Sequence, residues 1–264
     1  MYDIALIRMV EDIDIFNFMM AIIVSNLNKT INGRKIISDV NFSIPTGNSL
    51  VVIGGSGSGK SVLIKCILGL MLPDSSSSVV LCNHKVSNVH ISKRKYLLNR
   101  IGVAFQANAL FDSMPIWRNI AFSLIEGGGM DQKSAFDIAC AKLEMVGLDK
   151  SIANLFPSEI SGGMQRRVSI ARAIISEPDV LFLDEPTAGL DPITAKLIAD
   201  CINNLRMKLS MTVVTATHDM PYVNKLSDLI AVMHAGSLVW FGKKDDAGNS
   251  EHLSNFRKAA QIIN

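Results

Sequence analysis

The chain has 264 residues, which is enough for one substantial domain with a subsidiary lobe. Its 26 lysines and arginines nearly balance its 24 aspartates and glutamates, so no strong field would attract nucleic acid or acidic lipid. We therefore expect no nucleic-acid partner. The four cysteines are scattered and form no C-x-x-C pair, which indicates free thiols rather than zinc ligands or a disulfide framework.

The start of the sequence lacks the features of a targeting segment. Acidic side chains interrupt its apolar residues, whereas a secretory signal has a basic start and an unbroken apolar core. No stretch reaches the roughly 18 to 20 apolar residues that span a bilayer. We expect residues 1–20 to be an N-terminal extension, and a later start at Met19 or Met20 would leave them untranslated without harming the fold. These features predict a chain that stays in the cytoplasm.

The first predicted elements are two strands, Ala21–Val24 and Val40–Ile44, on either side of an Asn32-Gly33 pair. Asn-Gly is the strongest short-range signal for a tight hairpin turn. We therefore expect an antiparallel β flap at the start of the folded chain.

Five short apolar runs follow, and helical periodicity separates them over most of the chain. Such runs are typical of strands buried on both faces of a parallel sheet. Their alternation with helices predicts an α/β core. The predicted core strands are Leu50–Ile53, Ile101–Phe105, Val180–Leu183, Thr212–Thr215 and Leu229–Met233.

Strand signals vanish between the second and third of these strands. Two predicted helices, Trp117–Ile125 and Lys133–Val146, occupy this interval and are parted by three glycines. We therefore expect a helical subdomain at about 107–168, inserted into a main domain that covers residues 21–245.

The segment 246–264 is expected to form a C-terminal helical tail. Its stretch Ser250–Ile263 carries apolar residues at helical spacing. Two placements are open: the helix packs on its own core, or it docks on another subunit, as the resemblance described below would allow.

A glycine-rich segment follows the predicted strand that ends at Ile53 and opens a helix. Glycines let the backbone fold around an anion with its N–H groups pointing inward, and the helix N-terminus adds positive potential. This context predicts a phosphate-binding loop of the P-loop NTPase type, in which Lys60 reaches the β- and γ-phosphates and Ser61 ligates magnesium. The loop comprises Gly54, Gly55, Ser56, Gly57, Ser58, Gly59, Lys60 and Ser61.

Two acidic residues, Asp184 and Glu185, end the buried strand that begins at Val180. The carboxyl edge of a parallel sheet is where such folds bind ligands. Asp184 is the expected partner of magnesium, and Glu185 is the expected residue that polarises the attacking water. A solvated acidic strand end is the alternative if these residues are considered alone.

The segment from Ile160 to Arg167, with the sequence ISGGMQRR, resembles the signature motif of ABC ATPases. Ser161 would cap a helix and offer its hydroxyl, with the N–H groups of Gly162 and Gly163, to a γ-phosphate. In that family the phosphate is held by a second subunit. The resemblance therefore implies a homodimer with two ATP molecules between the chains, and a RecA-like core with an antiparallel β flap and an inserted helical subdomain.

Three further residues match family landmarks in the right order. Gln106 resembles the glutamine that contacts magnesium and the attacking water while connecting core and helical lobe. Asp191 ends a loop that resembles the one through which the two subunits sense each other's sites. His218 resembles the switch histidine that contacts the γ-phosphate. A lone histidine after a strand is more often structural, so its assignment depends on the other motifs.

The sequence departs from the usual family pattern at two places, and the second of them, Met164, narrows the choice of subfamily. The aromatic ring that usually stacks on adenine is missing, and the corresponding stretch supplies only Ile31, which puts a strict preference for adenine in doubt. Met164 stands where the commonest signature has glutamine. The segments Pro157–Val168 and Asp191–Ala195 are similar to the ATPases of Mla-type phospholipid transporters, which maintain outer-membrane lipid asymmetry. Methionine at this position also occurs in amino-acid importers.

The resemblance implies an ATPase subunit of an ABC transporter that uses ATP and Mg2+ and lies peripherally on the cytoplasmic face of the inner membrane. It further implies separate transmembrane permease subunits and a substrate-binding subunit, with phospholipid or another lipid as the cargo. The alternatives are an importer or exporter of another small substrate, or a soluble ABC ATPase that drives no transport. A P-loop kinase is a further rival, but it would need neither the signature motif nor a dimer.

Overall fold

The computed structural model describes residues 20–87, 89, 97, 99–105 and 109–249. The predicted N-terminal extension, apart from Met20, and the predicted helix Ser250–Ile263 lie outside these residues, and so does Gln106.

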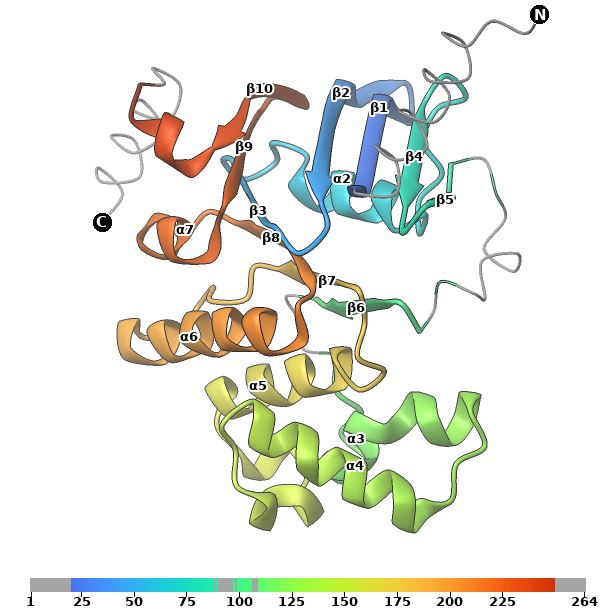
Figure 1. The fold of residues 1–264 in the computed structure, drawn as a ribbon, viewed down its shortest axis with the longest axis vertical. Helices are drawn as coiled ribbons and strands as arrows, with labels where there is room; N and C mark the ends of the chain where they lie inside the picture. Colours follow the sequence, from blue (N-terminus) through green and yellow to red (C-terminus); the bar gives the residue numbers. More distant parts are fainter. Residues whose placement is uncertain (1–19, 88, 90–96, 98, 106–108, 250–264) are drawn as a thin grey trace, which may run out of the picture.

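Two sheets form the β structure of the described chain (Figure 1). The first has the order β2-β1-β4-β5 and the second the order β10-β9-β3-β8-β7-β6. The strands of the first are β1 (Met20–Ile31), β2 (Arg34–Pro45), β4 (Ser78–Leu81) and β5 (His84–Lys85). Those of the second are β3 (Ser49–Ile53), β6 (Ile101–Ala104), β7 (Val180–Asp184), β8 (Thr212–Thr217), β9 (Leu229–His234) and β10 (Ser237–Lys243).

The first sheet contains the predicted flap. Strands β1 and β2 pair antiparallel, and their hairpin turns at Asn32 and Gly33, both of which have positive φ angles. This conformation suits Asn and Gly, so the Asn-Gly prediction is confirmed. The sequence did not predict β4, whose first residue, Ser78, belongs to a run of four serines that looks like a turn.

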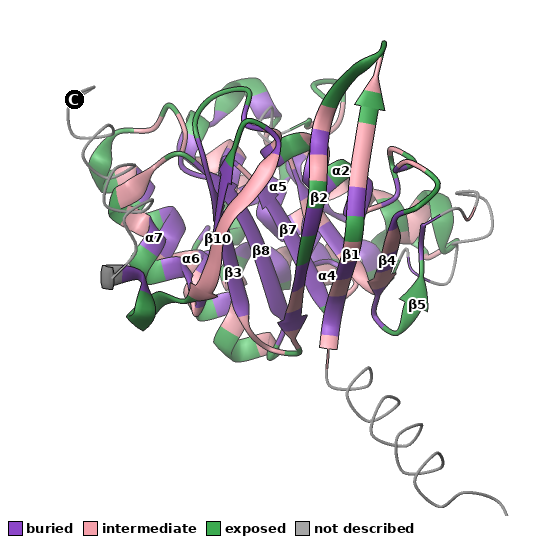
Figure 2. Cartoon of the chain, turned by 90° about the horizontal axis from the view of Figure 1, so that it is seen from above, coloured by how far each residue is buried: buried purple, intermediate pink, exposed green. Residues whose placement is uncertain are grey.

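The second sheet is the predicted α/β core, and all five predicted core strands are present in it. Strands β9, β3, β8, β7 and β6 run parallel, and only the edge strand β10 is antiparallel. Alternate residues face opposite sides: Val51 and Ile53 join one buried cluster, whereas Leu50 and Val52 join the other. The centre of the sheet is therefore buried on both faces (Figure 2). The prediction missed β10, although it contains the short apolar run Leu238–Phe241; its residues are mostly half-buried, as suits an edge strand.

Helices cover the core sheet and build a separate lobe (Figure 1). Helices α2 (Lys60–Ile67), α6 (Pro192–Leu209) and α7 (Met220–Leu226) belong to the core. The lobe contains α3 (Ile116–Phe122), the π-helix η2 (Ser123–Gly127), α4 (Gln132–Met145), and the 3-10 helices η3 (Lys150–Asn154) and η4 (Pro157–Glu159). Helix α5 (Gly162–Ala173) lies between lobe and core, so the predicted boundary at 168 falls within it. The last short element is the 3-10 helix η5 (Lys244–Asn249).

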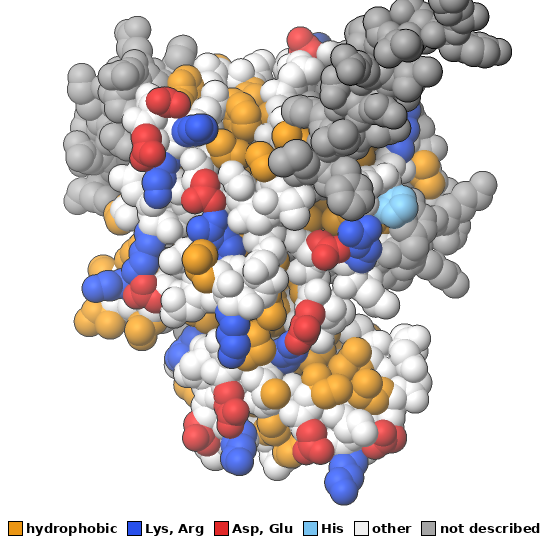
Figure 3. All heavy atoms as spheres, viewed as in Figure 1, with side chains coloured by type: hydrophobic (Ala, Val, Ile, Leu, Met, Phe, Trp, Pro, Cys, Tyr) orange, Lys and Arg blue, Asp and Glu red, His pale blue; other side chains and the backbone are white. Residues whose placement is uncertain are grey.

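The surface shows no separation of charge on the face drawn in Figure 3, where basic and acidic side chains are interspersed among the described residues. The near balance of charges in the composition is thus also a local balance on this face.

Candidate functional site

The glycine-rich loop joins the end of β3 to the first turn of α2, as the sequence predicted. Gly57 and Gly59 have φ angles of 74° and 103°, which L side chains rarely adopt. At Gly54 a Cβ atom would lie 2.4 Å from the carbonyl oxygen of Met233. Two kinds of constraint, backbone conformation and close approach, therefore require glycine in this loop.

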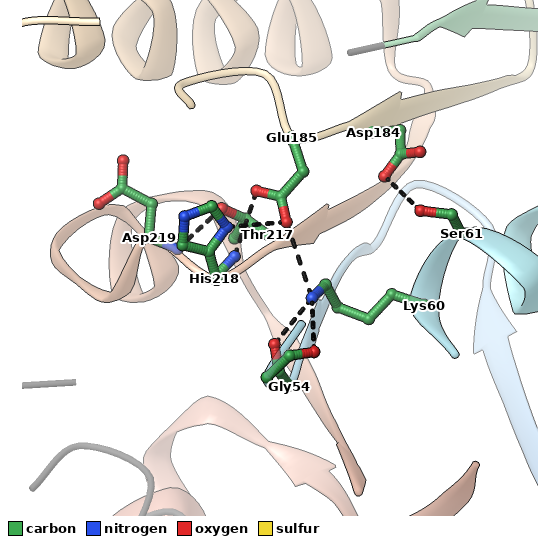
Figure 4. A network of polar contacts seen from close by, with 9 residues as sticks. Gly54, Lys60, Ser61, Asp184, Glu185, Thr217, His218 and Asp219 are labelled. Carbon is green, nitrogen blue, oxygen red and sulfur yellow. Dashed lines mark hydrogen bonds and ion pairs between the residues drawn. The ribbon is translucent and has the colours of Figure 1, made fainter. Parts of the chain in front are cut away.

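Lys60 is buried and points back into the loop (Figure 4). Its Nζ donates to the carbonyl oxygen of Gly54 at 2.7 Å and to that of Gly55 at 3.4 Å. It also lies 3.7 Å from Oε1 of Glu185. The ammonium group thus sits at the centre of the loop, where it can reach a phosphate that the backbone N–H groups hold.

Strand register explains why residues far apart in sequence meet here. The order β3-β8-β7 places the carboxyl ends of three parallel strands side by side, with Ile53 paired to Thr217 and Asp184 paired to Ala216. The phosphate loop, the acidic pair and His218 each follow one of these ends. The predicted meeting of the motifs at the carboxyl edge of the sheet is therefore what the fold produces.

Ser61 and Asp184 form the part of the site that suits magnesium. The Ser61 hydroxyl donates to Oδ1 of Asp184 at 3.3 Å (Figure 4). Burial raises the pKa of Asp184, an effect that its hydrogen bond from Ser61 partly offsets. Both groups offer hard oxygen ligands, which Mg2+ prefers, and Mg2+ commonly binds one or two carboxylates together with substrate phosphates. No group of three or more His, Cys, Asp and Glu side chains among the described residues could hold a metal by itself. The donor set thus fits a metal shared with a nucleotide.

Glu185 is held in an uncommon backbone conformation, with a φ angle of 52°. Its N–H donates to the carbonyl oxygen of Ala216 at 2.8 Å. Its buried carboxylate contacts His218 twice: Nδ1 lies 2.9 Å from Oε1, and the His218 N–H donates to Oε2 at 3.3 Å. Left-handed backbone at a residue other than glycine costs about 1 kcal/mol or more and is concentrated at functional sites.

These side chains can bind a polyphosphate and activate water. A carboxylate next to a cation and an imidazole is suited to orient a water molecule and take up its proton. The imidazole of His218 is 61% exposed and therefore accessible to a bound nucleotide. A magnesium ion, when held by Ser61 and Asp184, would neutralise charge on the phosphates. Within this chain, Lys60 would bind the phosphates and Glu185 would act on the water.

A second set of predicted residues makes local contacts elsewhere in the fold. Ser161 caps α5, and its hydroxyl accepts from the Met164 N–H at 3.3 Å, which confirms the predicted capping role. Ser161 and Gly162 are exposed. At Gly163 a Cβ atom would lie 2.4 Å from Cγ2 of Thr194, so glycine allows α5 and α6 to approach closely.

Asp191 caps α6, where its carboxylate accepts from the N–H groups of Ile193 and Thr194, both at 3.0 Å. None of these contacts of Asp191, Ser161 and Gly163 reaches the phosphate loop. The exposed signature end of α5 is therefore free to meet a second molecule, and whether it does stays a prediction.

Two further residues, Ile31 and Arg166, bear on the candidate site. Ile31 ends β1 and pairs with Arg34 in the hairpin, so no aromatic ring occupies the predicted base-stacking position. Arg166 has no predicted role, yet it is buried; burial lowers the pKa of its guanidinium group, and the negative charge of Glu185 partly offsets this effect. In the sequence, only its place in the signature motif singles out Arg166. The sequence of a short helix does not show which of its residues are buried, because burial depends on the strands against which the helix packs.

Comparison with known proteins gives a consistent result. The profile of the ABC transporter family matches residues 37–188. The dimer of the ATP-binding cassette MJ0796, in a post-hydrolysis state bound to ADP and phosphate, is 28% identical and superposes with a TM-score of 0.76 over 84% of this chain and 98% of that one.

Three relatives have different names, and two of these names state a transported compound. The probable ribonucleotide transport ATP-binding protein mkl of Mycobacterium leprae is 33% identical over 225 residues, which are 85% of this chain but 64% of that protein. The glutamine transport ATP-binding protein GlnQ of Geobacillus stearothermophilus is 36% identical, covering 87% of this chain and 91% of that one. The chloroplastic protein trigalactosyldiacylglycerol 3 of Arabidopsis thaliana is 36% identical, covering 81% and 66%. The chain therefore spans less than two thirds of the mycobacterial relative.

Proposed function

Because this chain belongs to the ABC transporter family, we propose that it is the ATP-binding and ATP-hydrolysing subunit of a transporter, with Mg2+ as the metal. We base this on one arrangement above all: Glu185 contacts both Lys60 and His218 at the end of the core sheet. A phosphate-binding cation beside a carboxylate that can activate water is suited to the hydrolysis of a triphosphate.

The working form in this proposal is a homodimer with two ATP molecules between the chains. Each ATP is held by the phosphate loop of one chain and by Ser161, Gly162 and Gly163 of the other. The exposure of Ser161 and Gly162, with Asp191 at the start of the neighbouring helix, supports this arrangement. ATP binding closes the dimer and hydrolysis opens it.

Transport requires membrane-spanning partners. In the described part of the chain, no helix combines the length and apolarity needed to cross a bilayer. We assign the crossing to separate permease subunits, with this chain bound peripherally at the cytoplasmic face of the inner membrane and its helical lobe passing on the motion. A substrate-binding subunit completes the proposed complex.

The favoured cargo is phospholipid or another lipid. The segments 157–168 and 191–195, which are similar to those of phospholipid-transporter ATPases, support this choice, as does a relative whose name is that of a glycolipid. Glutamine is the second candidate, because a glutamine-transport relative is equally identical. The residues of the site do not discriminate between lipid and glutamine as cargo, since in this proposal they act on nucleotide alone.

Purification from detergent-solubilised membranes tests the proposal. We expect permease subunits to co-purify, and the complex in vesicles to move labelled phospholipid in an ATP-dependent manner. The matched control is the complex with Glu185→Gln. Movement of glutamine in place of lipid would support the second candidate. A chain that hydrolyses ATP but is recovered without membrane proteins would indicate a soluble ABC ATPase instead.

A further inference from the structure

The turn between β9 and β10 consists of two residues, Ala235 and Gly236, whose φ angles are 45° and 83°. Two consecutive positive φ angles are typical of the tightest turns between antiparallel strands. Glycine adopts this conformation freely, whereas alanine is strained in it. This turn lies outside every motif that the sequence analysis assigned to the candidate site.

The turn connects two parts of the fold through main-chain hydrogen bonds. The Gly236 N–H donates to the carbonyl oxygen of Ser58, in the phosphate loop, at 3.1 Å. The carbonyl oxygen of Gly236 accepts from the N–H of Ser38, in strand β2 of the flap, at 2.9 Å. A single residue therefore joins the phosphate loop to the flap through its backbone.

The flap approaches the turn too closely for a side chain at position 236. A Cβ atom there would lie 2.3 Å from the carbonyl oxygen of Ile36, a distance that real Cβ atoms do not show. Strand β2 also approaches the phosphate loop directly, because a Cβ atom at Gly59 would lie 2.8 Å from Cδ1 of Ile37. Backbone contacts thus set the spacing between flap, turn and loop.

A second contact holds the flap on the same pair of strands. The rings of Phe42 in β2 and Phe241 in β10 have centroids 5.7 Å apart, and the two strands lie side by side (Figure 1). This separation is within the range that favours aromatic packing. The flap is therefore attached to the β9–β10 hairpin at the turn and also along β10.

The position of the turn has a consequence for a bound nucleotide. In the proposed function the phosphate loop holds the phosphates, and the nucleoside joined to them extends beyond the loop. The flap borders the loop at Gly59, and its hairpin carries Ile31, the expected base position. A nucleoside triphosphate would thus contact both of the parts that the turn joins.

We propose that Gly236 is a positioning residue whose backbone fixes the distance between the phosphate loop and the flap, so that the chain binds a nucleoside triphosphate by its phosphates and its base together. This rests on the proposed function. We call the Ser38–Gly236 and Gly236–Ser58 hydrogen bonds the bridge. Two contacts on one preorganised frame bind a ligand more tightly, because the second needs no separate ordering. Displacing the flap should therefore weaken only a ligand that has both parts.

Binding of two ligands to the full-length chain tests the bridge. The ligands are MgATP and magnesium tripolyphosphate, which has the phosphates but no nucleoside, and the background is Glu185→Gln so that ATP persists. Gly236→Ala adds a methyl group on the side of Ile36 and should displace β2 from the turn. We expect it to weaken MgATP binding by about tenfold, within the usual range of coupling between two sites, and to leave tripolyphosphate binding unchanged.

Gly47→Ala is the matched control. Gly47 has a φ angle of 79°, close to that of Gly236, yet a Cβ atom there would meet nothing within 4 Å. The control thus imposes similar backbone strain without displacing a neighbour, and both affinities should equal those of the background chain. If Gly236→Ala does not fold, Phe241→Leu loosens the second flap contact and should weaken MgATP binding alone, by a smaller factor.

The outcomes separate the two proposals. In the folded variant, unchanged MgATP affinity or an equal loss for both ligands would overturn the bridge and leave the proposed function standing. So would a background chain that binds MgATP but no tripolyphosphate, because its loop would then not bind phosphates independently of the nucleoside. A background chain that binds no MgATP would overturn the proposed function, and the bridge with it.

Discussion

Lys60 Nζ lies 3.7 Å from Oε1 of Glu185, and both side chains are buried. The residue assigned to the phosphates and the residue assigned to the water therefore already form a charge pair. In a site of low effective dielectric such a pair interacts strongly, so a phosphate entering the loop competes with Glu185 for the ammonium group. Nucleotide binding is therefore linked to release of the Glu185 carboxylate from Lys60.

This link predicts different outcomes for two substitutions. Glu185→Gln should lower hydrolysis by about 10²- to 10⁴-fold, the usual contribution of a general base. It should preserve ATP binding, because the amide removes the competing charge from Lys60. Lys60→Ala should damage binding and hydrolysis together. Hydrolysis rates and equilibrium ATP binding on the purified variants check both expectations, and near-normal turnover by Glu185→Gln would remove its assignment to water activation.

Asp184 gives the site a pH dependence. Because burial raises its pKa, its protonated form persists to higher pH than that of an exposed aspartate. We expect the Mg2+ requirement for ATP binding to rise as pH falls through this raised pKa, since a protonated carboxyl group is a poor ligand. Titrating Mg2+ at several pH values measures the effect. An affinity for Mg2+ that is constant down to about pH 4, where an ordinary aspartate titrates, would contradict it.

The same raised pKa predicts a gain in stability on substitution. Ionised Asp184 is disfavoured in the folded chain, so Asp184→Asn should raise the free energy of unfolding at about pH 8 without Mg2+. The gain should shrink as pH falls below the raised pKa and disappear below about pH 3, where Asp184 is protonated in the folded and unfolded chain alike. Urea unfolding at both ends of this range provides the measurement.

The missing aromatic ring at Ile31 predicts weak discrimination between bases. ATP and GTP should bind with similar affinity, and Ile31→Tyr should tighten ATP binding by about 1 kcal/mol if a stack forms. Ile31→Val is the matched control, because it changes size without adding a ring. Equal ATP affinities for the parent and Ile31→Tyr would show that another part of the chain holds the base.

Assembly can be tested by complementation. In the proposed dimer, mixing Lys60→Ala chains with Ser161→Arg chains produces one doubly defective site and one site built entirely of intact residues. We expect hydrolysis by the mixture to exceed that of either variant alone. Two results together would contradict the dimer and support a kinase-like chain. The mixture would be no more active than its components, and Glu185→Gln protein would stay monomeric in saturating ATP with its membrane partners.

The sequence alone determined the elements that depend on local pattern. The five core strands are continuous apolar runs, and the hairpin carries Asn32 and Gly33. The phosphate loop carries glycines that let its backbone fold around an anion. These features depend on side-chain periodicity and backbone freedom over a few residues, and both properties are set by residues that are close in the sequence. The chemical roles of Lys60, Ser61, Asp184 and Glu185 could likewise be predicted, because each directly follows or precedes such an element.

Only the tertiary structure decided which groups touch. The pair between Lys60 and Glu185, the double contact of His218, and the positive φ of Glu185 all arise because β3, β8 and β7 end side by side in register. The burial of Arg166 and its bond to Phe105 require α5 to lie against β6, which the bare backbone of Gly102 permits. Such contacts join residues between 33 and 125 positions apart, and no local periodicity encodes a distance across a sheet.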